Sequence, residues 1–364
     1  MSLNRKNRKN RYTDYLEKIV AILIDEARSG DDLKTAIGAM HTMLSEISGI
    51  NGAIKVRNEG YETKLRSGLA LSPGYAADCL LDTVRTVQYI RALDAAIQQM
   101  KSEFPGQCIN ILYAGTGPFA PFALAMTERY GSDEIQFTAL DIHLQSLDAL
   151  RCIVSALEIG DYFRDFIQCD ATEYRHPADT PVHIVITETM HRTVSREPHA
   201  AITLNLSSQL TKGGVFIPER VTVNASMSNT EKELAYLKGT LNESEIRDIR
   251  IDLGTVFELS ADRSYEYIED KTALVCSTVT IPDSASEMNE MVLSTHIQLF
   301  GPICIKEKES GITHPLFARA IEKPVPGDEV QFLFNLVGFP ELTYHKLDRD
   351  DDIFSKLEKA AMSL

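Results

Sequence analysis

Apolar residues recur at helical spacing through the first hundred residues. This period predicts an amphipathic helix over residues 12–27. Asp31 and Asp32 are placed to cap a second helix that ends near residue 47. Ser72 and Pro73 precede a third helical stretch, from residue 75 to about residue 100. The amino-terminal region is therefore expected to be helical.

From residue 109 the pattern changes to short apolar runs that alternate with helical stretches. The runs are rich in β-branched residues, as buried parallel strands are. Strands are expected at 109–113, 137–140, 166–169 and 183–186, and helices at 122–130, 147–159 and 198–210. Repeated strand–helix units of this length predict an α/β fold with a parallel, doubly wound sheet.

After Gly213 and Gly214 the helical period almost disappears. Strand-like runs follow at 215–217, 221–223, 273–275, 291–299 and 330–336, with one charged helical stretch at 230–250. A chain of 364 residues also exceeds one typical core. We therefore expect a helical region over 1–104, an α/β domain over 105–218 and a β-rich domain over 219–364.

Charge and cysteine usage narrow the partners and the compartment. The chain has 52 acidic and 37 basic residues, a net charge of −15, which argues against nucleic acid and anionic membranes as partners. The six cysteines are scattered without a CxxC pair, which favours reduced thiols in the cytoplasm and no zinc site. No apolar run approaches the length of a membrane span.

The first three predicted strands of the sheet end in residues suited to a nucleoside. Gly115 and Gly117 follow the first strand, where glycines allow close backbone approach to a ligand. Asp141 ends the second strand and is placed to accept both ribose hydroxyls, and Asp170 and Ala171 follow the third, where they suit an adenine edge. Each acid alone is more commonly a helix cap or a surface residue. Together they describe an adenosine site without a triphosphate loop.

Two more acids follow the fourth strand. Glu188 leaves its carboxyl end, and Glu197 stands nine positions later, before the next helix. Ligands of open α/β sheets bind at this edge, so the two carboxylates could bracket one cationic group. The alternative is that Glu188 caps the helix and Glu197 lies in its first turn.

At these residues the sequence resembles the class I S-adenosylmethionine-dependent methyltransferases, specifically the protein arginine methyltransferase group. The similarity is clear over about residues 75–225 and loose elsewhere. The matching segments are a helix at 82–89, the glycine loop at 113–120, the strand ends at 141 and 170–171, the two glutamates and a passage at 212–220 into a β-barrel. Ile312-Thr313-His314-Pro315 occupies roughly the place of the family's Thr-His-Trp loop.

The resemblance implies a Rossmann-like sheet with a carboxyl-terminal β-barrel-like domain, S-adenosylmethionine as cofactor, and a small-molecule or protein arginine as substrate. It assigns the cofactor to Arg85, Ala114, Gly115, Gly117, Asp141, Asp170 and Ala171, with Glu173 as a rival for the adenine position. Glu188 and Glu197 would clamp the guanidinium. His314 would be a proton acceptor or a loop anchor, or simply an exposed turn residue. The helical insertion at 231–250 corresponds to a dimerisation arm, which implies a homodimer.

Three departures leave alternatives open. Pro315 replaces the family's tryptophan, and His191 replaces a glycine beside the substrate slot. Arg192 and Arg196 lie inside the acidic loop, where they could pair with its glutamates or point outward and hold a substrate carboxylate. The chain could therefore methylate an arginine, methylate another small molecule, or be an inactive cofactor-binding partner.

Overall fold

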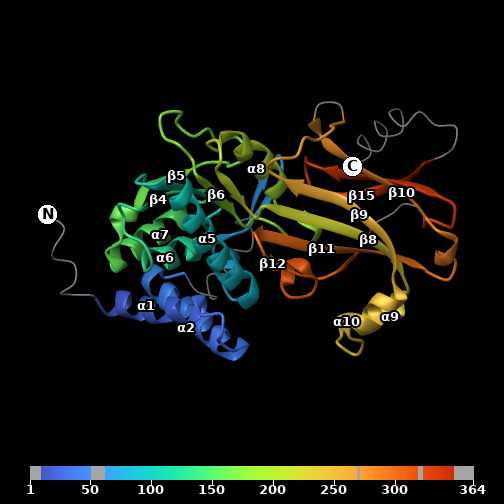
Figure 1. The fold of residues 1–364 in the computed structure, drawn as a ribbon, viewed down its shortest axis with the longest axis horizontal. Coiled ribbons are helices and arrows are strands. Elements are labelled where there is room, and N and C mark those ends of the chain that lie inside the picture. Colours follow the sequence, from blue (N-terminus) through green and yellow to red (C-terminus); the bar gives the residue numbers. More distant parts are fainter. Residues whose placement is uncertain (1–9, 51–61, 269–270, 319–322, 348–364) are drawn as a thin grey trace.

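The computed structural model describes residues 10–50, 62–268, 271–318 and 323–347. It confirms the predicted fold class: a parallel central sheet with a helical amino-terminal region and further antiparallel sheets (Figure 1). The predicted boundary after residue 218 falls in the short link between the parallel sheet and the antiparallel sheets. In the described part of the chain, no helix combines the length and the apolar character that a membrane span needs.

The central sheet has five parallel strands in the order β5-β4-β3-β6-β7. They are β3 (Ile109–Ala114), β4 (Ile135–Asp141), β5 (Phe163–Gln168), β6 (Ile184–Thr187) and β7 (Val215–Ile217). The intervening helices are α6 (Pro121–Thr127), α7 (Leu144–Leu157) and α8 (His199–Leu206). The helix expected to reach residue 210 ends at Leu206, and a 3-10 turn follows it. The chain leaves β3 in one direction and reaches β6 in the other, so the carboxyl ends of these strands border a crevice.

The amino-terminal helices are α1 (Arg11–Ile24), α2 (Gly30–Ser48), α4 (Pro73–Cys79) and α5 (Thr83–Glu103). The expectation that residues 31 and 32 cap α2 is wrong. The hydroxyl of Ser29 accepts from the backbone N–H of Asp32, and the two acids lie in the first turn, where the helix dipole favours them.

The single helix expected over 75–100 is two helices. The carboxylate of Asp82 accepts from the backbone N–H of Arg85 and so starts α5 as a new helix. A short hairpin, β1 (Thr63–Leu65) and β2 (Gly68–Ala70), precedes α4 and was not predicted.

The carboxyl-terminal half contains two antiparallel sheets, in the orders β12-β11-β8-β9 (with β13 on β11) and β10-β14-β15. Their strands are β8 (Arg220–Ser228), β9 (Ile251–Ser260), β10 (Ala273–Thr280), β11 (Glu290–Phe300), β12 (Ile303–Ile305), β13 (Leu316–Phe317), β14 (Glu329–Asn335) and β15 (Glu341–Leu347). The rings of Phe257 and Phe334 stack at 4.5 Å and join the two sheets in one core. Strands β9 and β15 were not among the predicted strands. The charged insertion is a helical arm, α9 (Thr230–Leu237) and α10 (Glu243–Ile249).

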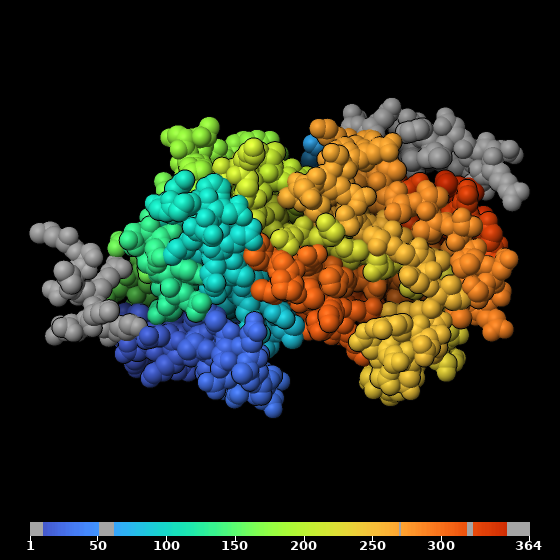
Figure 2. Space-filling model, in the orientation of Figure 1, coloured from blue at the N-terminus to red at the C-terminus, as the bar shows by residue number. Residues whose placement is uncertain are grey.

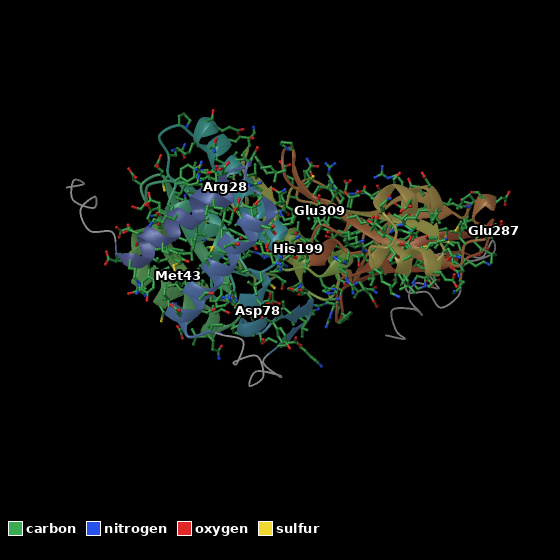
Figure 3. The ribbon with its side chains drawn as sticks, turned by 90° about the horizontal axis from the view of Figure 1, so that it is seen from below. Arg28, Met43, Asp78, His199, Glu287 and Glu309 are labelled. Atoms are coloured by element: carbon green, nitrogen blue, oxygen red, sulfur yellow. The ribbon has the colours of Figure 1, made fainter. Side chains whose placement is uncertain are left out.

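The two halves meet beside the crevice. The carboxylate of Asp82, at the start of α5, accepts from the hydroxyl of Ser310 at 2.7 Å and from the N–H of Gly311 at 2.9 Å. Figure 3 shows His199 at this junction and Glu287 at the far end of the antiparallel half. The loop before His314 is thus anchored to the helix that carries Arg85.

Candidate functional site

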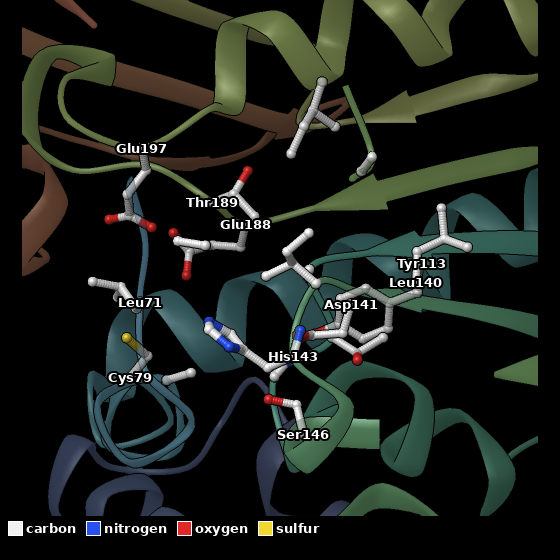
Figure 4. Close-up of a pocket in the computed structure, with 18 of the residues that line it drawn as sticks. Leu71, Cys79, Tyr113, Leu140, Asp141, His143, Ser146, Glu188, Thr189 and Glu197 are labelled. Atoms are coloured by element: carbon white, nitrogen blue, oxygen red, sulfur yellow. The ribbon is translucent and has the colours of Figure 1, made fainter. Parts of the chain in front are cut away.

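A cavity of about 1070 Å³, a volume that includes its open mouth, lies at the carboxyl ends of β3, β4 and β6 (Figure 4). Its walls come from the glycine loop after β3, the turns after β4 and β5, the acidic loop after β6, and α4 and α5. Leu65, Leu69 and Leu71 in and beside the β1–β2 hairpin also line it. Its position and size are typical of a small-molecule site.

The glycine loop needs its glycines for two reasons. Gly115 and Gly117 have φ of 70° and 58°, which favour glycine. A Cβ at Gly115 would also lie 2.4 Å from Cγ2 of Thr189, which follows Glu188. The loop therefore packs directly on the acidic loop and leaves its backbone facing the cavity.

Asp141 holds the glycine loop and the turn after β4 together. Its two oxygens accept from the backbone N–H groups of Gly117 and His143, each at 2.8 Å. Burial raises the pKa of this carboxyl group, and the hydrogen bonds act in the opposite direction. A carboxylate has about four acceptor positions, so Asp141 can still accept from ribose hydroxyls.

Asp170 and Ala171 also line the cavity, whereas Glu173 does not. One oxygen of Asp170 accepts from the N–H and the hydroxyl of Thr172, at 2.9 and 2.7 Å. Asp170 is thus partly used as a cap of its own turn. What it offers a ligand is its second oxygen.

Arg85 and Glu188 form a buried ion pair. Nη1 of Arg85 lies 3.0 Å from Oε2 of Glu188, and Nη2 donates to the backbone oxygen of Cys79 at 2.7 Å. The side chains are 9% and 11% exposed. Oε1 of Glu188 is buried without a hydrogen-bond partner in the described chain. The residue predicted to meet the cofactor and the first predicted clamp residue therefore touch each other.

Glu197 faces the same space as Glu188 (Figure 4). Burial, reinforced by the charge of Glu188, raises its pKa to about 8. Its carboxylate has no ion-pair partner among the residues that the structure describes. Two buried carboxylates thus share one permanently charged cation in the cavity wall, Arg85.

Neither Arg192 nor Arg196 forms a described ion pair with these glutamates, although the charge of Arg196 partly offsets the rise in the pKa of Glu197. Both line a separate surface hollow, and no described ion pair joins either of them to a carboxylate. The guanidinium of Arg196 lies 5.8 Å from the ring centre of Phe339. His191 lines the same hollow and does not line the cavity, so it does not crowd that space.

Two predicted site residues lie outside the lining. Ala114 is fully buried at the end of β3, and His314 follows the turn that is anchored to Asp82. Among the lining residues that the sequence did not single out are Thr116 and His143. His143 stands two positions after Asp141, the last residue of β4. That position in the sequence could have indicated that His143 lines the cavity.

The cavity fits the cofactor that the resemblance implies. Three of its polar atoms are buried and lack a partner in the described structure: Thr116 Oγ1, His143 Nε2 and Glu188 Oε1. Buried polar atoms are seldom left without a partner, so a polar ligand is expected there. Within the described ranges no group of acids, histidines and cysteines could hold a metal ion.

Two of the solved structures that are similar to this chain come from arginine methyltransferases. The PRMT1 enzyme–prozyme heterotetrameric complex of Trypanosoma brucei with AdoHcy has a TM-score of 0.48 at 13% identity, over 76% of this chain and 99% of that chain. Protein arginine methyltransferase 10 of Arabidopsis thaliana, in an open conformation, has a TM-score of 0.47 at 12% identity, over 71% and 86%. No protein-family model and no curated protein matches the sequence.

Proposed function

We propose that the chain is an S-adenosylmethionine-dependent methyltransferase that acts on a guanidino group, in a protein arginine or in free arginine. The observation that carries the proposal is the cavity shared by the glycine loop, Asp141, Glu188 and Glu197. It combines a wall suited to an adenosine with two buried carboxylates that have one cation between them. A guanidinium would supply a second positive charge once Glu197 has lost its proton.

The acids would act by position and charge. A guanidinium has a pKa above about 12 and is a poor nucleophile, since its lone pairs are delocalised. Oε1 of Glu188 is unpartnered, and Glu197 has no cation of its own. Charge-assisted hydrogen bonds to these groups would fix one guanidinium nitrogen for attack and draw positive charge towards the others. The bound cofactor would supply an electrophilic methyl group and a neutral thioether leaving group. As the new N–CH₃ bond forms and the S–CH₃ bond breaks, the methylated nitrogen would release one proton, which the carboxylate of Glu197 would accept.

The walls of the cavity would position the cofactor. The backbone at Gly115 and Gly117 approaches closely, Asp141 offers its remaining acceptor positions to hydroxyls, and Arg85 faces the cavity with its remaining N–H groups. The apolar side chains of the hairpin would exclude water. With all six cysteines free, we also propose a reducing, cytoplasmic setting.

The direct test is incubation of the full chain with isotopically labelled cofactor and free arginine or a cell extract. We expect a methyl mass increment on a guanidino nitrogen. A methyl group found only on another compound would favour a different small-molecule methyltransferase. Tight cofactor binding without transfer to any acceptor would favour an inactive partner protein.

Asp141 gives a test of the cofactor site alone. Asp141→Ala should weaken S-adenosylmethionine by roughly 1.5–3 kcal/mol in calorimetric titration, because hydrogen bonds to a charged acceptor are lost. Asp141→Asn is the matched control for shape, because its single carbonyl oxygen keeps part of the loop contacts. Unchanged affinity in a folded Asp141→Ala protein would contradict the assignment.

We further propose that the chain forms a homodimer through the arm α9–α10. Figure 2 shows the arm standing out from the body. It is held rigidly, because the guanidinium of Arg250 pairs with Glu233 at 2.7 Å and with Glu307 at 2.9 Å. Leu234 on the arm is 42% exposed.

Leu234→Asp should give a monomer by light scattering, because a charge would be buried in the interface. The substitution leaves the anchor at Arg250 in place, whereas deleting the arm would remove Glu233. Leu144→Asp, at a similarly exposed leucine of α7, is the control. A wild-type protein that is itself monomeric would refute the proposal.

A further inference from the structure

The loop between Glu188 and Glu197 has a second face. Its two ends line the cavity, but the residues between them line an open hollow of about 860 Å³ that the antiparallel sheets complete. Consecutive residues line different spaces at both ends of the loop. Met190 lines the cavity and the next residue, His191, lines the hollow. Arg196 lines the hollow and the next residue, Glu197, lines the cavity. The loop is therefore a thin partition between the two spaces.

The backbone of this partition is strained. Thr193, Val194 and Arg196 have φ of 56°, 60° and 68°, and such angles are rare for residues other than glycine, above all for β-branched ones. Neighbouring elements hold the strain in place. The hydroxyl of Thr295 accepts from the N–H of Thr193 at 3.2 Å, and the oxygen of Pro340 accepts from the N–H of Arg196 at 2.7 Å. Strain that the surroundings fix in this way clusters at functional sites.

The result is a positive hollow on an acidic protein. Arg192 and Arg196 have no carboxylate within ion-pair distance among the described residues, although the chain carries a net charge of −15. Arg192, Arg196 and His191 line the same space, and burial together with the charges of the two arginines lowers the pKa of His191 to about 4. Glu341 also lines the hollow. Two positive charges therefore face one negative charge.

We propose that this hollow binds an anionic group, a carboxylate or a phosphate, of the same molecule whose guanidinium enters between Glu188 and Glu197. The inference rests on the proposed function and narrows its substrate class to guanidines that also carry an acid. Guanidinium groups suit such ligands, because their planar N–H fork matches carboxylate and phosphate oxygens. The anionic group could come from two kinds of substrate. It would be the carboxylate of free arginine, or an acidic or phosphorylated residue beside arginine in a peptide.

The test compares the full wild-type chain with the double variant Arg192→Gln/Arg196→Gln. Both proteins are saturated with S-adenosylhomocysteine. Arg66→Gln is the control, because Arg66 is exposed in the hairpin turn and lines neither space. The calorimetric probes are inorganic phosphate, L-arginine and agmatine, which is arginine without its carboxylate. A peptide pair with glutamate or glutamine beside arginine separates the two sources of the acid.

The wild type should bind phosphate. It should also bind L-arginine more tightly than agmatine, or the glutamate peptide more tightly than the glutamine peptide, by about tenfold or more, as expected for hydrogen bonds between charged groups. The double variant should lose both properties while its affinity for agmatine and its melting temperature stay unchanged. Phosphate binding and acid preference that survive in the double variant, or equal affinity for both members of each pair in the wild type, overturn the inference.

The two proposals fail separately. Arginine-dependent phosphate binding without methyl transfer to any guanidine would leave the anion site standing and reject the proposed reaction. Equal methylation of agmatine and L-arginine, with no phosphate binding, would leave the reaction standing and reject the anion site.

Discussion

Glu188→Gln is expected to reduce methyl transfer by at least about 10²-fold and to destabilise the fold at the same time. Transfer falls because the clamp loses a charge that orients the nucleophile and stabilises it in the transition state. Stability falls by about 3 kcal/mol, because Arg85 remains buried without its carboxylate partner. Cofactor affinity should stay within a few-fold. Transfer is measured well below the melting temperature, so unfolding does not explain the loss.

The second substitution Arg85→Met separates these effects. Added to Glu188→Gln, it removes the unpaired buried charge and should restore much of the lost melting temperature, but not transfer. Normal transfer in Glu188→Gln would reject the clamp. A large drop in melting temperature with undiminished transfer in the folded fraction would make Glu188 purely structural.

Glu197→Gln should reduce methyl transfer by a similar factor. Unlike Glu188→Gln, it should make the folded state more stable than that of the wild type at high pH. The pKa of Glu197 is about 8 in the folded chain and near 4.5 when unfolded. Between these values the folded state binds more protons, so this group makes the fold less stable as pH rises. The glutamine variant lacks that slope and should melt above the wild type at pH 9.

The same group sets an expected pH dependence of binding. Below about pH 8 the carboxyl group of ligand-free Glu197 holds a proton, which must leave before it can pair with a guanidinium. The KM for the guanidine should therefore fall as pH rises through 8 in the wild type. A flat profile, or an unchanged profile in Glu197→Gln, would contradict this role.

Sequence patterns were sufficient to predict the parallel sheet, and most of the candidate residues they indicated line one cavity. The central strands β3, β4 and β6 are short and mostly apolar, and Gly115, Asp141, Asp170 and Glu188 mark the ends of β3, β4, β5 and β6. Strand β15 was missed because its inward face holds few apolar residues. Those residues are Leu342 and Tyr344. Strand β9 was missed although Val256, Phe257 and Leu259 are buried in it.

Contacts between distant residues could not be predicted in this way. Arg85 and Glu188 are 103 positions apart, and nothing in either segment shows that they touch. The arginines nearest in sequence, Arg192 and Arg196, were the natural candidates to pair with the glutamates. The strained backbone of the loop turns both away, and positive φ at Thr193 and Val194 has no sequence signal.

The ion pair between Arg85 and Glu188 also has a thermodynamic consequence. In the ligand-free chain each group satisfies part of the hydrogen-bonding capacity of the other. An anionic cofactor group that attracts Arg85 leaves Glu188 available to a guanidinium, and a guanidinium on Glu188 leaves Arg85 available to the cofactor. The two ligands are then coupled, and linkage requires each to raise the affinity of the other by the same factor. The pair would thus favour the ternary complex over either half-filled site.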